Sequence, residues 1–170
     1  DTEFVMNKYA IVHPGIVPFP PAIIIGRDHD LEILKEKLGA KVKTTSVAQA
    51  TTIIRGWPGA GKSTIASALA FDPDIARAFP DGVLWVSLGQ EPNILSEMAS
   101  WGIALGRDEI LKTNSIQGTQ NLLASALRNK RMLLIVDDVW QSEHAIPFNV
   151  GGPGCKTLVT TRLNDVAREL

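Results

Sequence analysis

The chain has 170 residues, enough for one domain with its own hydrophobic core. Its hydrophobic fraction of 45% and charged fraction of 21% are those of an ordinary globular protein. The net charge of −1 lacks the basic excess typical of nucleic-acid binding, and a single cysteine, Cys155, excludes an intrachain disulfide or a cysteine-based zinc site.

Membrane insertion and secretion are not indicated by the sequence. The longest aliphatic runs, such as residues 132–136, are too short to cross a bilayer, and no charged-then-apolar signal segment opens the chain. A lone cysteine fits a reducing compartment. We therefore expect a soluble, cytoplasmic protein with no membrane partner and no direct nucleic-acid partner.

The N-terminal part divides into an arm and a helix. Residues 1–22 hold four prolines and no helical period, which predicts an extended arm. Residues 28–38 place leucines at helical spacing with charges between them, which predicts an amphipathic helix. Asp28 is the expected N-cap, and Gly39 follows the expected end.

Four strand-like runs follow, alternating with helical patterns. The strands are expected at residues 52–55, 83–88, 132–137 and 156–161. The helices are expected at residues 61–71, 94–103, 119–128 and 164–170. This alternation predicts an α/β fold with a mostly parallel sheet and right-handed crossovers. The last helix stops about two turns after its expected cap, Asn164, which suggests a fragment of a longer protein.

Residues 56–63 read GWPGAGKS, which matches the phosphate-loop pattern G-x-x-x-x-G-K-[ST] at every fixed position. Glycines let backbone N–H groups converge on phosphate oxygens, and the following helix adds its own N-terminal donors. The expected phosphate-binding residues are Gly59, Ala60, Gly61, Lys62, Ser63 and Thr64. Among these, Lys62 would reach the terminal phosphates and the Ser63 hydroxyl would bind Mg²⁺.

Two further strand ends carry polar groups. The apolar run LLIV at 133–136 ends in Asp137 and Asp138. Asp137 is the candidate carboxylate for the metal, and Asp138 could orient or deprotonate a water that attacks the γ-phosphate. Residues 156–161 end in hydroxyls before Arg162, whose guanidinium could contact the γ-phosphate. A helix cap or turn at the acids and a solvated arginine are the plainer alternatives.

Together these segments resemble the NB-ARC family of signal-transduction ATPases. The resemblance rests on IIIGRD at 23–28, the phosphate loop, LLIVDDVW at 133–140 and TTR at 160–162. It implies a three-layer P-loop NTPase fold with strand order 1-4-3-2, over a domain spanning residues 23–170. It also implies that Ile25, Gly26 and Arg27 flank the adenine, that Asp138 is the second acid, and that Arg162 is the sensor arginine.

The resemblance further implies that the chain stops before the helical and winged-helix subdomains of the family, which would be its partners within a longer chain. The leading hypothesis is a switch operated by ADP and ATP with Mg²⁺, with weak or no hydrolysis, in which exchange controls opening and homo-oligomerisation. A turnover ATPase of the motor class is the alternative. That class typically has a glutamate after the first acid, where this chain has Asp138.

Overall fold

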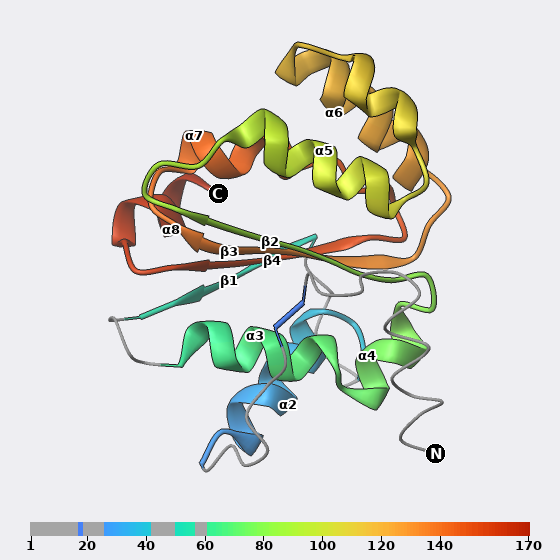
Figure 1. Ribbon diagram of the computed structural model, residues 1–170. Coiled ribbons are helices and arrows are strands. Elements are labelled where there is room, and N and C mark those ends of the chain that lie inside the picture. The colour runs from blue at the N-terminus through green and yellow to red at the C-terminus, as the bar shows by residue number, and fades with distance from the viewer. Residues whose placement is uncertain (1–16, 19–25, 42–49, 57–60) are drawn as a thin grey trace.

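The computed structural model describes residues 17–18, 26–41, 50–56 and 61–170. Within them the chain forms three layers, with one sheet between two groups of helices (Figure 1). Most of the expected arm at 1–22 lies outside the described residues, as do Ile25, Gly59 and Ala60.

The sheet has four parallel strands in the order β1-β4-β3-β2. Their bounds are Thr51–Arg55 for β1, Gly82–Gly89 for β2, Met132–Val139 for β3 and Lys156–Thr161 for β4. Each of the four expected strands is present, and the expected strand order is confirmed. Because all four strands run the same way, their carboxyl ends meet at one edge of the sheet.

The helices cover both faces of the sheet (Figure 1). One face carries α2 (Asp28–Lys37), α3 (Lys62–Ala70) and α4 (Pro73–Ala78). The other carries α5 (Ile94–Ala104), α6 (Ile116–Leu127), α7 (Ser142–Ala145) and α8 (Asn164–Glu169). Two 3₁₀ turns, η1 (Asp108–Lys112) and η2 (Ile146–Phe148), join this second group.

Strand β3 shows how the core is divided between the two faces. Leu133 and Ile135 pack with α2, α3 and α4, whereas Leu134 and Val136 pack with α5 and α6. All four side chains are 0% exposed. This alternation is the period of two that a strand imposes, so a continuous apolar run fills two cores at once.

Several helix ends differ from the sequence-based expectation. The N-caps of α2 and α8 are Arg27 and Leu163, so the expected caps Asp28 and Asn164 are instead the first helical residues. Asp28 still lies in the first turn, where a negative charge interacts favourably with the helix dipole. Helix α6 begins three residues earlier than expected, because Ser115 caps it by accepting a hydrogen bond from the N–H of Gly118.

Helix α4 was not expected from the sequence, although its signals are ordinary. Asp72 accepts a 2.8 Å hydrogen bond from the N–H of Asp74, and Pro73 occupies the first helical position. No helix within the described ranges is long and apolar enough to cross a membrane.

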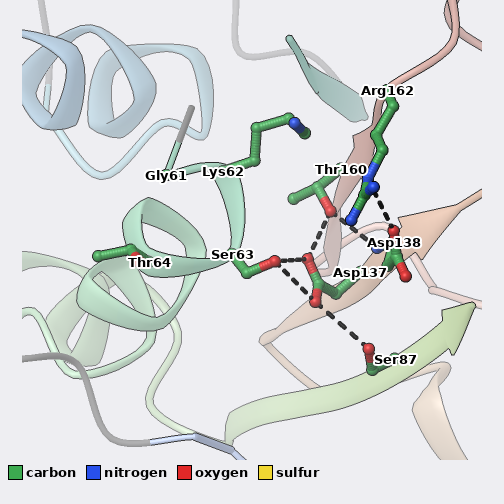
Figure 2. Close-up of a pocket in the computed structure, with 9 residues that line it drawn as sticks. All are labelled: Gly61, Lys62, Ser63, Thr64, Ser87, Asp137, Asp138, Thr160 and Arg162. Atoms are coloured by element: carbon green, nitrogen blue, oxygen red, sulfur yellow. Dashed lines mark hydrogen bonds and ion pairs between the residues drawn. The ribbon is translucent and has the colours of Figure 1, made fainter. Parts of the chain in front are cut away.

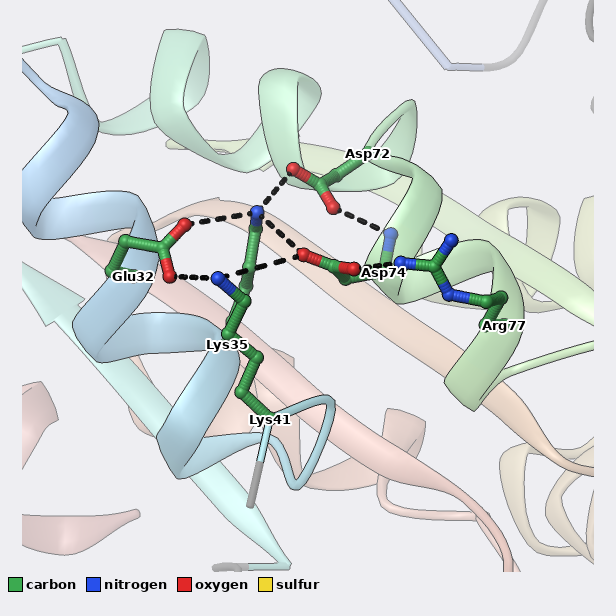
Figure 3. A network of polar contacts seen from close by, with 6 residues as sticks. All are labelled: Glu32, Lys35, Lys41, Asp72, Asp74 and Arg77. Atoms are coloured by element: carbon green, nitrogen blue, oxygen red, sulfur yellow. Dashed lines mark hydrogen bonds and ion pairs between the residues drawn. The ribbon is translucent and has the colours of Figure 1, made fainter. Parts of the chain in front are cut away.

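A buried lysine joins α2 to α4. Lys35 is 6% exposed, and its Nζ lies 2.7 Å from Asp72, 3.1 Å from Asp74 and 3.2 Å from Glu32 (Figure 3). Burial alone would lower the pKa of Lys35, but its hydrogen bonds to the three carboxylates outweigh burial and raise that pKa. Lys41 and then Lys35 lower the pKa of Glu32, and Lys35 lowers that of Asp74. The packing of α2 against the domain therefore includes an ionic contact.

Candidate functional site

A cavity of about 330 Å³ lies between the start of α3 and the carboxyl ends of β2, β3 and β4. Gly61 is the N-cap of α3 and has φ = 80°, a left-handed conformation that favours glycine. The first intrahelical bond runs from the N–H of Ile65 to the oxygen of Gly61. The N–H groups at the start of a helix precede its first intrahelical bond, so a helix N-terminus such as that of α3 can bind an anion.

Asp137 sits at the bottom of this cavity and accepts hydrogen bonds from hydroxyls on three different elements (Figure 2). Ser63 Oγ donates to its Oδ1 at 2.8 Å and its Oδ2 at 3.0 Å. Thr160 Oγ1 donates to Oδ1, and Ser87 Oγ lies 3.4 Å from Oδ2. Asp137 is 4% exposed, and this ring of donors supplies its buried carboxyl group with hydrogen-bond partners.

The spacing between Ser63 and Asp137 suits a magnesium ion. Adjacent ligands of octahedral Mg²⁺, at about 2.0–2.1 Å from the metal, lie about 3 Å apart. The Ser63 and Asp137 oxygens are 2.8–3.0 Å apart. Mg²⁺ bound to phosphates takes only one or two of its ligands from the protein. The oxygens of Ser63 and Asp137 could therefore supply all the protein ligands that such an ion needs.

Asp138 reaches the same cavity through an irregularity in β3. The pairing of β3 with β4 shifts register between Val136 and Val139, and Asp138 has φ = 56°. Val136 and Val139 consequently contribute to the same core although they are an odd number of positions, three, apart along the chain. In a regular strand Asp137 and Asp138 would face opposite sides of the sheet. The bulge and the left-handed residue instead bring both carboxylates to one cavity.

Lys62 and Arg162 place two positive charges on this cavity. Lys62 Nζ donates a 2.7 Å hydrogen bond to the carbonyl of Gly56, the residue that directly follows β1. Burial lowers the pKa of Lys62, and the charge of Arg162 lowers it further, although Asp138 and Asp137 oppose this. An anion bound between the two cations would relieve both the burial cost and their repulsion.

Arg162 follows β4 directly. Its Nε lies 3.6 Å from Asp138 Oδ1, and its Cζ lies 5.3 Å from the centre of the Trp140 ring. The guanidinium therefore borders the cavity between the second acid and an aromatic face (Figure 2 shows the acid).

A second cavity, of about 320 Å³, adjoins the first and shares Lys62 with it. Its walls come from the start of α2, from β1 and from α3, and include Arg27, Leu34, Ile54 and Ile65. Arg27 pairs with Asp30 at 3.1 Å, and its Nη2 lies 3.7 Å from the point where a Cβ on Gly61 would stand. The structure thus brings Arg27 close to the phosphate loop, while Gly26 turns the chain into α2 with φ = 73°.

Of the expected site residues, those described at the first cavity are Gly61, Lys62, Ser63, Thr64, Asp137, Asp138 and Arg162. Sequence reasoning assigned no role to Ser87 or to the Thr160 hydroxyl, which both contact the Asp137 carboxylate. The signal for Ser87 is a single polar residue in an otherwise apolar strand, and its meaning depends on register, because Ser87 pairs with Asp137 across β2 and β3.

The NB-ARC domain family model matches residues 27–170. The chain belongs to the NB-ARC domain family. Its relatives include apoptotic protease-activating factor 1 of Danio rerio, 30% identical over 163 residues that make up 90% of this chain and 12% of the relative. A probable disease resistance protein of Arabidopsis thaliana is 27% identical over 151 residues, 84% of this chain and 17% of the relative.

Regulatory protein AfsR of Streptomyces griseus is 30% identical over 137 residues, 76% of this NB-ARC chain and 14% of the relative. The chain thus spans less than a fifth of each of these relatives. Among solved structures, Cdc6p of Pyrobaculum aerophilum gives a TM-score of 0.57 at 16% identity. The match covers 95% of this chain and 44% of the Cdc6p chain.

The ORC2 protein of Aeropyrum pernix, solved as ADPNP–ADP complexes, gives a TM-score of 0.58 at 13% identity. The match covers 94% of this chain and 46% of the ORC2 chain. At these identities the two structural likenesses bear on the fold alone. The NB-ARC domain described here is therefore a P-loop nucleotide-binding domain with a four-stranded parallel sheet.

Proposed function

We propose that this NB-ARC domain binds ADP or ATP and uses the difference between them as a regulatory switch. One observation carries the proposal: a single cavity collects the helix N-terminus, a lysine, a hydroxyl–carboxylate pair, a second acid and an arginine. Each of these groups would have a different role in binding the phosphates, the metal ion or the attacking water. A simple anion site would need only the helix N-terminus and the lysine.

The residues would divide the nucleotide's terminal phosphates among them. The N–H groups that begin α3 and Lys62 would bind the β- and γ-phosphates, and Ser63 and Asp137 would hold Mg²⁺, which neutralises part of the phosphate charge. Gly59 and Ala60 complete the proposed loop. On the adjoining cavity, Ile25, Gly26 and Arg27 would flank the adenine, whose apolar ring suits the walls formed by Leu34, Ile54 and Ile65.

Arg162 would distinguish ATP from ADP. A ligand biases a switch only through contacts that differ between its two states. A charge-assisted hydrogen bond from Arg162 to the γ-phosphate contributes about 1.5–3 kcal/mol, which corresponds to a preference of roughly ten- to a hundredfold. This contact exists only with ATP, so it supplies the required difference.

Hydrolysis is proposed to be weak. Asp138 is the residue that would orient or deprotonate the attacking water, and it stands where the turnover class of ATPases typically has a glutamate. The efficient base of that class is therefore missing from this position. ATP would consequently persist long enough to act as a signal rather than be consumed in rapid turnover.

At the level of the whole protein, we propose that ADP favours a closed form and that exchange for ATP favours an open form that self-associates in the cytoplasm. Helical and winged-helix subdomains of a longer chain would close over the nucleotide. The multidomain length of the relatives supports this proposal, since the chain matches only 12–17% of them.

Nucleotide released from the purified and denatured protein tests the function directly. We expect ADP or ATP from the wild type and none from Lys62→Ala, with Lys112→Ala as a control because that exposed lysine on η1 lies away from the cavity. Equal nucleotide content in wild type and Lys62→Ala would overturn the proposed site. Rapid steady-state ATP hydrolysis would instead support the motor class.

A further inference from the structure

Arg162 has two neighbours whose arrangement suggests how it is kept ready for a ligand. The Asp138 carboxylate lies 3.6 Å from its Nε, and the Trp140 ring lies under its Cζ at 5.3 Å. The side chains of Arg162 and Asp138 are 38% and 30% exposed. An ion pair this open to water is weak, so a stronger anion can replace it.

Two hydroxyl groups at the end of β4 fix this arrangement by bonding to the backbone of β3. The N–H of Asp138 donates to Thr160 Oγ1 at 2.8 Å, and Thr161 Oγ1 donates to the Val139 carbonyl at 2.8 Å. The Thr161 hydroxyl also accepts from the N–H of Leu163 at 3.1 Å. These bonds join the backbone on either side of the bulge to the backbone on either side of Arg162.

Trp140 and Arg162 each follow one of these joined segments, so their meeting is a consequence of the backbone geometry. Asp138 has the uncommon positive φ of 56°. Backbone conformations of this kind cost energy, and they are concentrated at functional sites. A guanidinium whose face is turned to an aromatic ring keeps the N–H donors in its plane available to a second partner. Trp140 can therefore hold Arg162 while Arg162 binds an anion, whereas Asp138 competes with that anion for the same donors.

We propose that Trp140 is a positioning residue that holds the Arg162 guanidinium at the cavity, and that Asp138 is its resting partner, which a γ-phosphate replaces. The inference rests on the proposed function and deepens it. One arginine then couples two events, because binding of ATP to Arg162 also frees the Asp138 carboxylate to face water. When ADP is bound, the ion pair between Arg162 and Asp138 stays intact.

The test of Trp140 is ATP and ADP affinity, in the presence of Mg²⁺, measured by calorimetry on the full chain. Trp140→Leu is expected to weaken ATP binding about two- to fivefold, from the loss of a cation–π contact, and to leave ADP binding unchanged. Trp140→Phe keeps an aromatic face and should retain most of the ATP affinity. In an Arg162→Ala background, Trp140→Leu should have no further effect.

The test of Asp138 is a double-mutant cycle with Arg162. Asp138→Asn is expected to strengthen ATP binding by removing the competing carboxylate, and more so in the wild type than in Arg162→Ala, where only repulsion of phosphate is relieved. An equal effect in both backgrounds would overturn the role of Asp138 as resting partner. A Trp140→Leu loss that affects ADP equally, persists without Arg162 or is absent would overturn the role of Trp140.

Failure of this inference is distinguishable from failure of the switch itself. If the wild type and Arg162→Ala bind ATP with the same affinity, the proposed function fails at its sensor. If they differ and Trp140→Leu behaves as the wild type does, only the positioning role is wrong.

Discussion

Replacement of Lys35 by methionine removes a buried charge and keeps a side chain of similar length. The shortest contact of Lys35, 2.7 Å to Asp72, joins side chains that are only 8% and 15% exposed. A hydrogen bond between charged groups contributes about 1.5–3 kcal/mol when it is buried, and partial exposure reduces this to about 1–2 kcal/mol. For a chain of this size, 1 kcal/mol corresponds to about 2–4 °C in Tm. We therefore expect Lys35→Met to lower Tm by about 2–8 °C.

Thermal unfolding at pH 7, followed by circular dichroism, measures this difference. Lys37→Met is the matched control, because Lys37 occupies the same last turn of α2 and is exposed. The control should change Tm by less than about 2 °C, as surface substitutions usually do. If Lys35→Met and Lys37→Met have the same Tm, the ionic contact between α2 and α4 contributes nothing measurable and the reasoning is wrong.

Three more predictions concern stability. Glu32 and Asp74 have lowered pKa values, so their contribution to stability is complete above about pH 5 and is lost as pH falls through those lowered values. The difference in Tm between wild type and Lys35→Met should therefore narrow in melts between about pH 5 and pH 2. Asp138→Asn should leave Tm nearly unchanged, because asparagine tolerates φ = 56°. Asp138→Val should lower the free energy of unfolding by about 1–2 kcal/mol in urea titrations. Equal urea midpoints for the two variants would contradict the positive φ at residue 138. Gly152→Ala would place a Cβ 2.6 Å from the Arg128 carbonyl and should cost about 1–3 kcal/mol by the same titration; an unchanged midpoint would show that this loop can move.

The sequence was informative wherever local chemistry determines local structure. Short strand-like runs, three of them nearly continuous in apolar residues, identified all four strands. Glycine spacing with Lys62 and Ser63 identified the phosphate loop, because both patterns act within a few residues. The strand order came from the family resemblance and not from periodicity, since periodicity does not reveal which strands are neighbours. The structure confirms that order.

Features that depend on contacts between distant segments could not be predicted in the same way. Lys35 looked like an exposed charge in an amphipathic helix, and only the position of α4 shows why it is buried. The role of Ser87 depends on its register with Asp137. The bulge that turns Asp138 into the cavity rests on hydroxyl groups of β4, 22 residues further along the chain.

The central claim is that Arg162 distinguishes ATP from ADP within a phosphate-binding cavity. Calorimetric titration of the full chain with each nucleotide and Mg²⁺, for wild type and Arg162→Ala, tests it most directly. We predict that Arg162→Ala weakens ATP binding at least tenfold and changes ADP binding less than twofold, in keeping with about 1.5 kcal/mol or more for a charged hydrogen bond. Equal affinities for ATP and ADP that Arg162→Ala leaves unchanged would contradict the account.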